Sequence, residues 1–135
     1  RLEEADLPLD GVVVLVEDEP EIRRVIEQII RGIGCRVLSF PDAEQALVYA
    51  QGCSVNLLVT DAVLPGLSGI DLAEKLVGLQ PKLQVMVISA YLPQNSARLD
   101  SSWHCISKPF SRPRIERAVR RALLAGTQGV SQTKS

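Results

Sequence analysis

Short, continuous apolar runs alternate along the chain with stretches in which apolar residues recur every three or four positions. Runs rich in β-branched residues are typical of strands buried on both faces of a sheet, whereas the longer period is typical of helices with one buried face. The runs predict five strands, at residues 12–16, 35–40, 55–59, 84–88 and 104–107. Strands that alternate with helices predict an α/β fold, a three-layer doubly wound parallel sheet.

The helical stretches begin at residues that favour helix starts. Pro20 suits the first position of a helix, and Asp42 and Ser111 have short polar side chains that cap helix N-termini. A further helical pattern covers residues 69–79. Together with the strands, these starts predict a single folded domain over residues 9–125.

Glycine, proline and polar residues mark where regular structure is expected to stop. Gly32 and Gly34 are expected to end the first helix. Residues 90–102, between the fourth and fifth strands, have only a weak apolar period and predict a short or irregular helix. Residues 1–8 are read as an N-terminal tail or linker, and residues 126–135 as a polar C-terminal tail.

Composition excludes several classes of protein. The 135 residues are 46% hydrophobic, and 15 basic residues nearly balance 16 acidic ones, so net charge indicates no nucleic-acid or membrane contact by this domain. No apolar run approaches the roughly 20 residues of a membrane span. The three cysteines, Cys35, Cys53 and Cys105, lack metal-ligand spacing and leave one unpaired, which indicates a reducing compartment, the cytoplasm. Each is interpreted as a small buried hydrophobe.

Reactive side chains follow the predicted strands. Glu17 and Asp18 end the first strand, Asp61 the third and Ser89 the fourth, and Lys108 follows the fifth. The carboxyl ends of parallel strands meet at one edge of the sheet, where three carboxylates would repel one another. A hard cation such as Mg²⁺ relieves that repulsion, and Lys108 and Ser89 could then hold the oxygens of a phosphoryl group bonded to Asp61. No glycine-rich nucleotide motif follows the first strand.

Four segments, VLVEDEP, VTDAVLPGLSG, VISA and ISKPF, occur in the order seen in a known family. From about Leu9 to Gly126 the chain resembles a response regulator receiver (CheY-like) domain. This resemblance implies the flavodoxin-like (βα)5 sheet with strand order 2-1-3-4-5. It also implies a phosphorelay role, in which the domain takes a phosphoryl group from a phosphohistidine and assists its own phosphotransfer and dephosphorylation.

The resemblance assigns roles residue by residue. Asp61 is the expected phosphoacceptor, and Glu17, Asp18, Asp61 and the backbone carbonyl of Val63 are the expected Mg²⁺ ligands. Ser89 is the hydroxyl that turns toward the phosphoryl group, and Lys108 is its ion-pair partner. The Lys108–Pro109 peptide is expected to be cis.

The sequence departs from the family pattern where switching is expected. Receivers commonly carry Tyr or Phe three residues before the active-site lysine, as the partner of Ser89 in the switch, and this chain has Cys105 there. Such a departure suits a relay station better than a transcriptional switch.

Val63 and Tyr91 occupy the positions that influence hydrolysis in the family, and neither is suited to activating water, so slow self-dephosphorylation is expected.

The implied partner is a histidine kinase or a histidine phosphotransfer domain. The chain lacks an initial Met and an output domain, so it is read as part of a hybrid sensor histidine kinase or of a response regulator without its output domain. The longer parent can be membrane-anchored, and a homodimer is also compatible with the sequence.

Other interpretations remain open at this point. One is a pseudo-receiver, a protein-binding module with this fold that is not phosphorylated. Another is a Mg²⁺-dependent phosphatase of the haloacid-dehalogenase type, although Val63 stands where such enzymes carry a second Asp. Simpler interpretations make Glu17 and Asp18 charges at a helix start, Asp61 a turn residue and Lys108 a solvated lysine. The last helix carries arginines that form either a solvated face or a partner-binding patch, at positions 112, 114, 117, 120 and 121.

Overall fold

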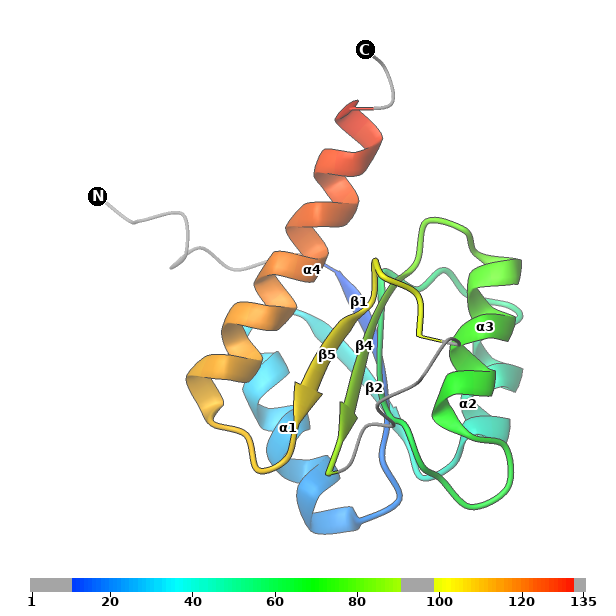
Figure 1. The fold of residues 1–135 in the computed structure, drawn as a ribbon, viewed down its shortest axis with the longest axis vertical. Coiled ribbons are helices and arrows are strands. Elements are labelled where there is room, and N and C mark those ends of the chain that lie inside the picture. The colour runs from blue at the N-terminus through cyan, green and yellow to red at the C-terminus, as the bar shows by residue number, and fades with distance from the viewer. Residues whose placement is uncertain (1–10, 91–98, 133–135) are drawn as a thin grey trace.

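A five-stranded parallel sheet forms the centre of the computed structural model, which describes residues 11–90 and 99–132. The strand order β2-β1-β3-β4-β5 confirms the expected topology (Figure 1). The strands are β1 (Val12–Val16), β2 (Arg36–Phe40), β3 (Leu57–Asp61), β4 (Gln84–Ser89) and β5 (His104–Ser107). The short helix expected before β5 falls largely on residues 91–98, outside the described residues.

Helices cover both faces of the sheet, as the alternating pattern predicts (Figure 1). Successive residues of a strand point to opposite faces, so β1 contributes Val13 and Leu15 to one core and Val14 and Val16 to the other. The first core is closed by α1 (Pro20–Ile33) and α4 (Arg112–Gln132). The second core is closed by α2 (Ala43–Ala50) and α3 (Gly69–Leu79).

The predicted helix starts are confirmed. Helix α1 begins at Pro20. The Asp42 carboxylate accepts a hydrogen bond from the Gln45 backbone N–H at 2.9 Å, and the Ser111 hydroxyl accepts one from the Arg114 N–H at 3.3 Å. Each cap satisfies a backbone donor that has no partner within its helix.

The predicted helix ends need two corrections. Gly32 lies inside α1, and only Gly34 ends it, with φ 114° in the left-handed region that glycine adopts without strain. Helix α4 continues to Gln132, through the segment interpreted as a polar tail. That segment contains no proline, and a single glycine such as Gly126 costs a helix only about 1 kcal/mol, so its polar composition does not stop the helix.

Strand register brings the reactive residues to one edge of the sheet. Strand β3 begins at Leu57, later than expected, and it includes Thr60 and Asp61 because Asp61 pairs in register with Ile88 of β4. Ser89 pairs in the same way with Ser107 of β5. The carboxyl ends of β3, β4 and β5 are therefore level with one another.

Helix α3 approaches this edge so closely that its first residue must be glycine. A Cβ atom added to Gly69 would overlap the Asp61 carbonyl oxygen and would lie 2.7 Å from the Thr60 hydroxyl oxygen. The Gly69 N–H donates to the Ala62 carbonyl at 3.1 Å, so the backbone has little room to move away. The loop after Asp61 is thus held against the strand end.

We expect Gly69→Ala to lower the free energy of unfolding by about 3 kcal/mol, because the new methyl group must displace backbone at Asp61. Gly78→Ala, in the same helix, is the matched control: a Cβ there meets no atom within 4 Å. The control should gain about 0.5 kcal/mol from helix propensity. Urea unfolding of both variants tests this, and equal effects would contradict the close approach at Gly69.

Candidate functional site

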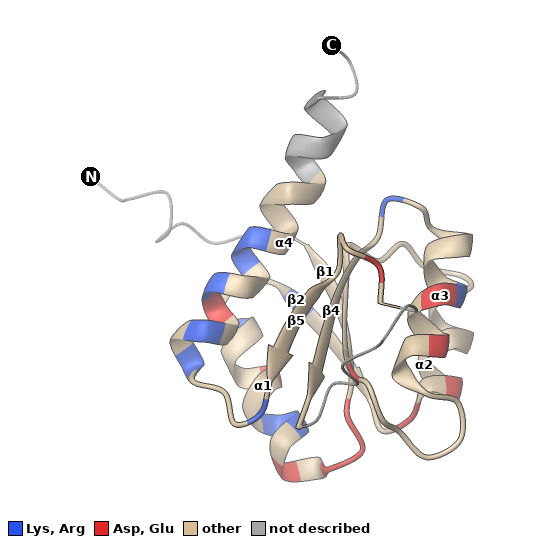
Figure 2. Cartoon of the chain, in the orientation of Figure 1, with Lys and Arg blue, Asp and Glu red and all other residues tan. Residues whose placement is uncertain are grey.

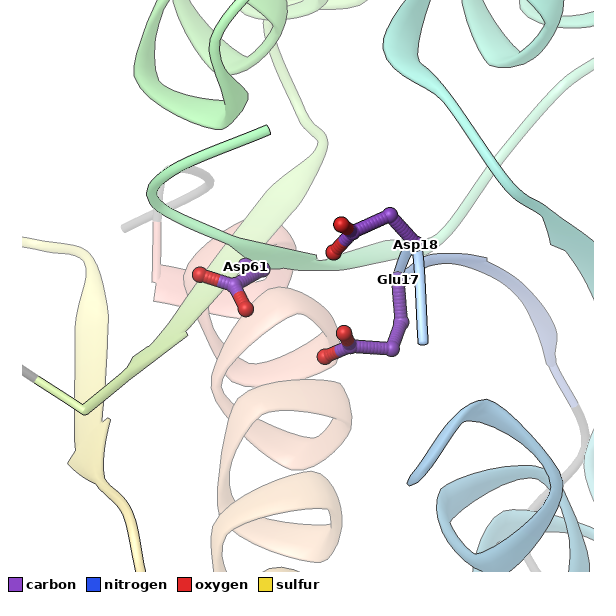
Figure 3. Close-up of side chains that lie close together, drawn as sticks. All are labelled: Glu17, Asp18 and Asp61. Atoms are coloured by element: carbon purple, nitrogen blue, oxygen red, sulfur yellow. The ribbon is translucent and has the colours of Figure 1, made fainter. Parts of the chain in front are cut away.

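Three carboxylates converge at the carboxyl edge of the sheet, as the sequence predicts (Figure 3). Glu17 and Asp18 follow β1, and Asp61 is the last residue of β3. One oxygen of each lies within 4.8 Å of the others, a spacing at which a single metal ion could bind all three. Glu17 and Asp61 are buried, whereas Asp18 is exposed.

Lys108 places a positive charge between two of these carboxylates. Its Nζ donates to Asp61 Oδ2 at 2.8 Å and to Glu17 Oε1 at 3.2 Å. The Lys108–Pro109 peptide is cis, as expected, and the Lys108 backbone N–H donates to the Ser89 carbonyl at 2.9 Å. Lys108 is therefore not a solvated lysine, and Asp61 is more than a turn residue.

Burial and hydrogen bonding shift the pKa of Glu17 in opposite directions, and the same holds for the pKa of Lys108. Burial raises the pKa of Glu17, despite the hydrogen bonds from the Glu19 N–H and Lys108 that favour its ionised form. Burial alone would lower the pKa of Lys108, but the hydrogen bond and charge of Asp61, followed by those of Glu17, outweigh it and raise that pKa. The ammonium group stays charged, and one positive charge faces three carboxyl groups.

Hydrogen bonds hold Glu17 and Asp61 in place at the strand ends. Asp61 Oδ1 accepts from the Val63 N–H at 3.1 Å, and Glu17 Oε2 accepts from the Glu19 N–H at 3.1 Å. The Arg23 guanidinium donates to the Glu17 carbonyl at 2.7 Å. Sequence reasoning did not identify Arg23; its place one turn into the helix that follows the acidic pair was the available signal.

The remaining predicted site residues have different surroundings. Ser89 is buried at the end of β4, beside the strand that carries Asp61. Val63 is 71% exposed next to the carboxylates. Cys105 is exposed on β5, and Cys53 is exposed too, so the interpretation of all three cysteines as buried holds only for Cys35. The alternation of buried and exposed residues along β5 explains the exposure of Cys105, because its neighbour Ile106 takes the buried position.

Comparison with known protein families identifies the family of this chain. The model of the response regulator receiver domain matches residues 13–120, most of the chain and every predicted site residue. The chain belongs to this family. Membership excludes the phosphatase interpretation, and it identifies the protein as a receiver domain of two-component signalling, a class that works with histidine kinases or phosphotransfer proteins.

Individual relatives agree with this assignment. The receiver is 28% identical over 113 residues to the C4-dicarboxylate transport transcriptional regulatory protein DctD of Rhizobium meliloti, covering 82% of this chain but only 25% of DctD. It is 28% identical to the response regulator receiver protein CpdR of Brucella abortus, covering 84% of this chain and 97% of CpdR. The solved receiver domain of the hybrid histidine kinase CckA is 30% identical, with TM-score 0.73, over 84% of this chain and 99% of that one.

None of the helices in the described ranges is long and apolar enough to cross a membrane.

We expect Lys108→Met, measured without metal, to lower the free energy of unfolding by about 1–3 kcal/mol, because Glu17 and Asp61 lose their shared cation. Adding Mg²⁺ should stabilise this variant more than it stabilises the parent, since Mg²⁺ then relieves a larger repulsion among the carboxylates. Lys82→Met, at an exposed position, is the control and should change stability by less than about 0.5 kcal/mol. Urea unfolding with and without Mg²⁺ measures both effects; unchanged stability of Lys108→Met would contradict the bridge.

Proposed function

We propose that Asp61 is the phosphoacceptor and takes its phosphoryl group from the phosphohistidine of a histidine kinase or a histidine phosphotransfer domain. A carboxylate oxygen of Asp61 bonds to phosphorus while the phosphorus–nitrogen bond of the donor breaks, and the imidazole leaves and recovers a proton from solvent. The observation that carries this proposal is the 2.8 Å contact of Lys108 Nζ with Asp61 Oδ2 at the end of a buried strand.

The carboxylates fit Mg²⁺, which prefers a few carboxylate oxygens together with water and phosphate oxygens. Glu17, Asp18, Asp61 and the backbone carbonyl of Val63 would hold it. Bound there, the ion would neutralise negative charge that accumulates on the transferring group. The donor set supports this choice because it contains only hard oxygen ligands and no cysteine or histidine.

The chain's own residues supply the rest of the chemistry. The Val63 N–H holds one oxygen of Asp61, and this fixes the rotation of the carboxylate. The Lys108 ammonium, already in place, would pair with phosphoryl oxygens once Asp61 Oδ2 is modified. The Ser89 hydroxyl would donate a further hydrogen bond from the end of the adjacent strand.

The place of this receiver in its pathway is also a proposal. Cys105, at the position where receivers commonly carry an aromatic ring, favours a relay station over a transcriptional switch. CpdR is a receiver of nearly this length, and the CckA receiver comes from a hybrid histidine kinase. A response regulator without an output domain and a receiver of a hybrid kinase therefore both have precedents among the relatives.

We expect incubation with Mg²⁺ and acetyl phosphate to add one phosphoryl group to the parent and none to Asp61→Asn, because Asp61 is the carboxylate that Lys108 and the Val63 N–H hold at the end of β3. Asp100→Asn removes an exposed carboxylate and should be phosphorylated like the parent. Intact-mass spectrometry under mild conditions reads the result. Absence of the adduct with acetyl phosphate and with a phosphorylated histidine phosphotransfer domain would support the pseudo-receiver instead.

We expect the phosphorylated receiver to lose its phosphoryl group slowly, over minutes or longer. Val63 presents an exposed aliphatic side chain beside Asp61 and has no group that could activate an attacking water. Tyr91, the second residue implicated, lies outside the described residues. Following the mass of the purified adduct without any phosphatase tests this, and loss within seconds would show that another group activates water.

A further inference from the structure

The turn between β1 and α1 carries two of the three carboxylates that face one another at the site. Glu17 and Asp18 are consecutive, and both side chains extend toward Asp61 (Figure 3). Both oxygens of Glu17 accept hydrogen bonds, from the Glu19 N–H at 3.1 Å and from Lys108 Nζ at 3.2 Å. Asp18 is exposed, and within residues 11–90 and 99–132 no hydrogen bond holds its carboxylate. The position of the Asp18 carboxylate therefore depends on the backbone of the turn.

Arg23 holds this backbone on both sides of Asp18. Its guanidinium donates to the Glu17 carbonyl at 2.7 Å, and its backbone N–H donates to the Glu19 carbonyl at 2.9 Å. The bond to Glu19 belongs to the helix, and any residue with an N–H could make it at this position. The bond to Glu17 depends on the arginine side chain, and it is a charge-assisted hydrogen bond, which is stronger than one between neutral groups.

The charge of Arg23 and the hydrogen bond that it makes have opposite effects on a cation. Figure 2 shows acidic residues along the turn after β1 and basic residues at the following turn of α1. A guanidinium charge near the acidic pair repels Mg²⁺, so only the hydrogen bond to the turn can favour binding of the ion. Arg24 carries the same charge at the next position and is exposed, and in the described part of the chain it makes no hydrogen bond to the turn. The two neighbouring arginines therefore separate position from charge.

We propose that Arg23 is a positioning residue for the Mg²⁺ site, because its guanidinium fixes the turn that carries Glu17 and Asp18 and so orients Asp18 before the ion binds. This inference rests on the proposed function, in which these residues hold Mg²⁺ during phosphotransfer to Asp61. Lys108, which also holds Glu17, would turn to the phosphoryl group in that reaction. The Arg23 guanidinium instead contacts a backbone carbonyl that takes no part in the transfer. Arg23 therefore keeps the turn in place when Lys108 changes partner.

The test titrates Mg²⁺ alone into the full chain and measures its dissociation constant from backbone amide NMR shifts. Arg23→Met removes the donor and should weaken Mg²⁺ binding about tenfold, as expected when a group that orients a metal ligand is lost. Arg24→Met removes the same charge from an exposed position and should bind Mg²⁺ within about twofold of the parent. Arg23→Lys keeps a cationic donor on a shorter side chain and should recover part of the lost affinity. Amide shifts away from the turn should match the parent in all three variants.

Phosphorylation by acetyl phosphate gives a second readout. Arg23→Met should need about tenfold more Mg²⁺ for its half-maximal rate and should reach the rate of the parent at saturating Mg²⁺. The role of Arg23 would be overturned by Mg²⁺ binding in Arg23→Met that equals or exceeds that of the parent, by equal losses in Arg23→Met and Arg24→Met, by a lower saturating rate, or by a parent that binds no Mg²⁺.

Failure of the proposed function gives a different result. A parent that binds Mg²⁺ but accepts no phosphoryl group would contradict the assignment of Asp61 as phosphoacceptor. Weaker Mg²⁺ binding in Arg23→Met, with parent-like binding in Arg24→Met, would still support the positioning role of Arg23, because that titration contains no phosphodonor.

Discussion

The shared ion pair of Lys108 with Asp61 and Glu17 is the interaction on which the functional edge of this receiver depends. Two buried carboxylates near a third would destabilise the fold without a cation. Lys108 supplies that cation in the absence of metal, and its contacts of 2.8 and 3.2 Å connect the segment after β5 to the ends of β3 and β1. The same charge is then available for an anion that arrives at Asp61.

Close packing around Asp61 gives this pair a fixed geometry. Strand register sets the height of Asp61 beside Ile88, Gly69 allows α3 to contact its backbone, and the Val63 N–H holds one of its oxygens. The reactive carboxylate is thus oriented before any partner binds, which is the form of preorganisation that lowers the cost of group transfer.

The sequence predicted the topology and the main site because both depend on local pattern. Buried parallel strands form continuous β-branched runs, and reactive residues at their ends must meet, so Glu17, Asp18, Asp61 and Lys108 were identifiable together. The role of Arg23 was not, because its contact is with a backbone carbonyl, which no side-chain motif records. Gly32 and the helical continuation past Gly126 were misjudged because glycine weakens a helix without determining its end.

The two surfaces of the domain have distinct electrostatic characters. Acidic groups gather at the carboxyl edge of the sheet, whereas Arg114, Arg117 and Arg121 of α4 line, together with β5, a groove of about 480 Å³. A net charge of −1 conceals this separation. The most direct measurement is a crystal structure of the chain with Mg²⁺ and beryllofluoride, a phosphoryl mimic. The account predicts the mimic on Asp61, with Lys108 Nζ and the Ser89 hydroxyl bonded to it and Mg²⁺ among the carboxylates. An unmodified Asp61 still paired with Lys108 at saturating concentrations would contradict it.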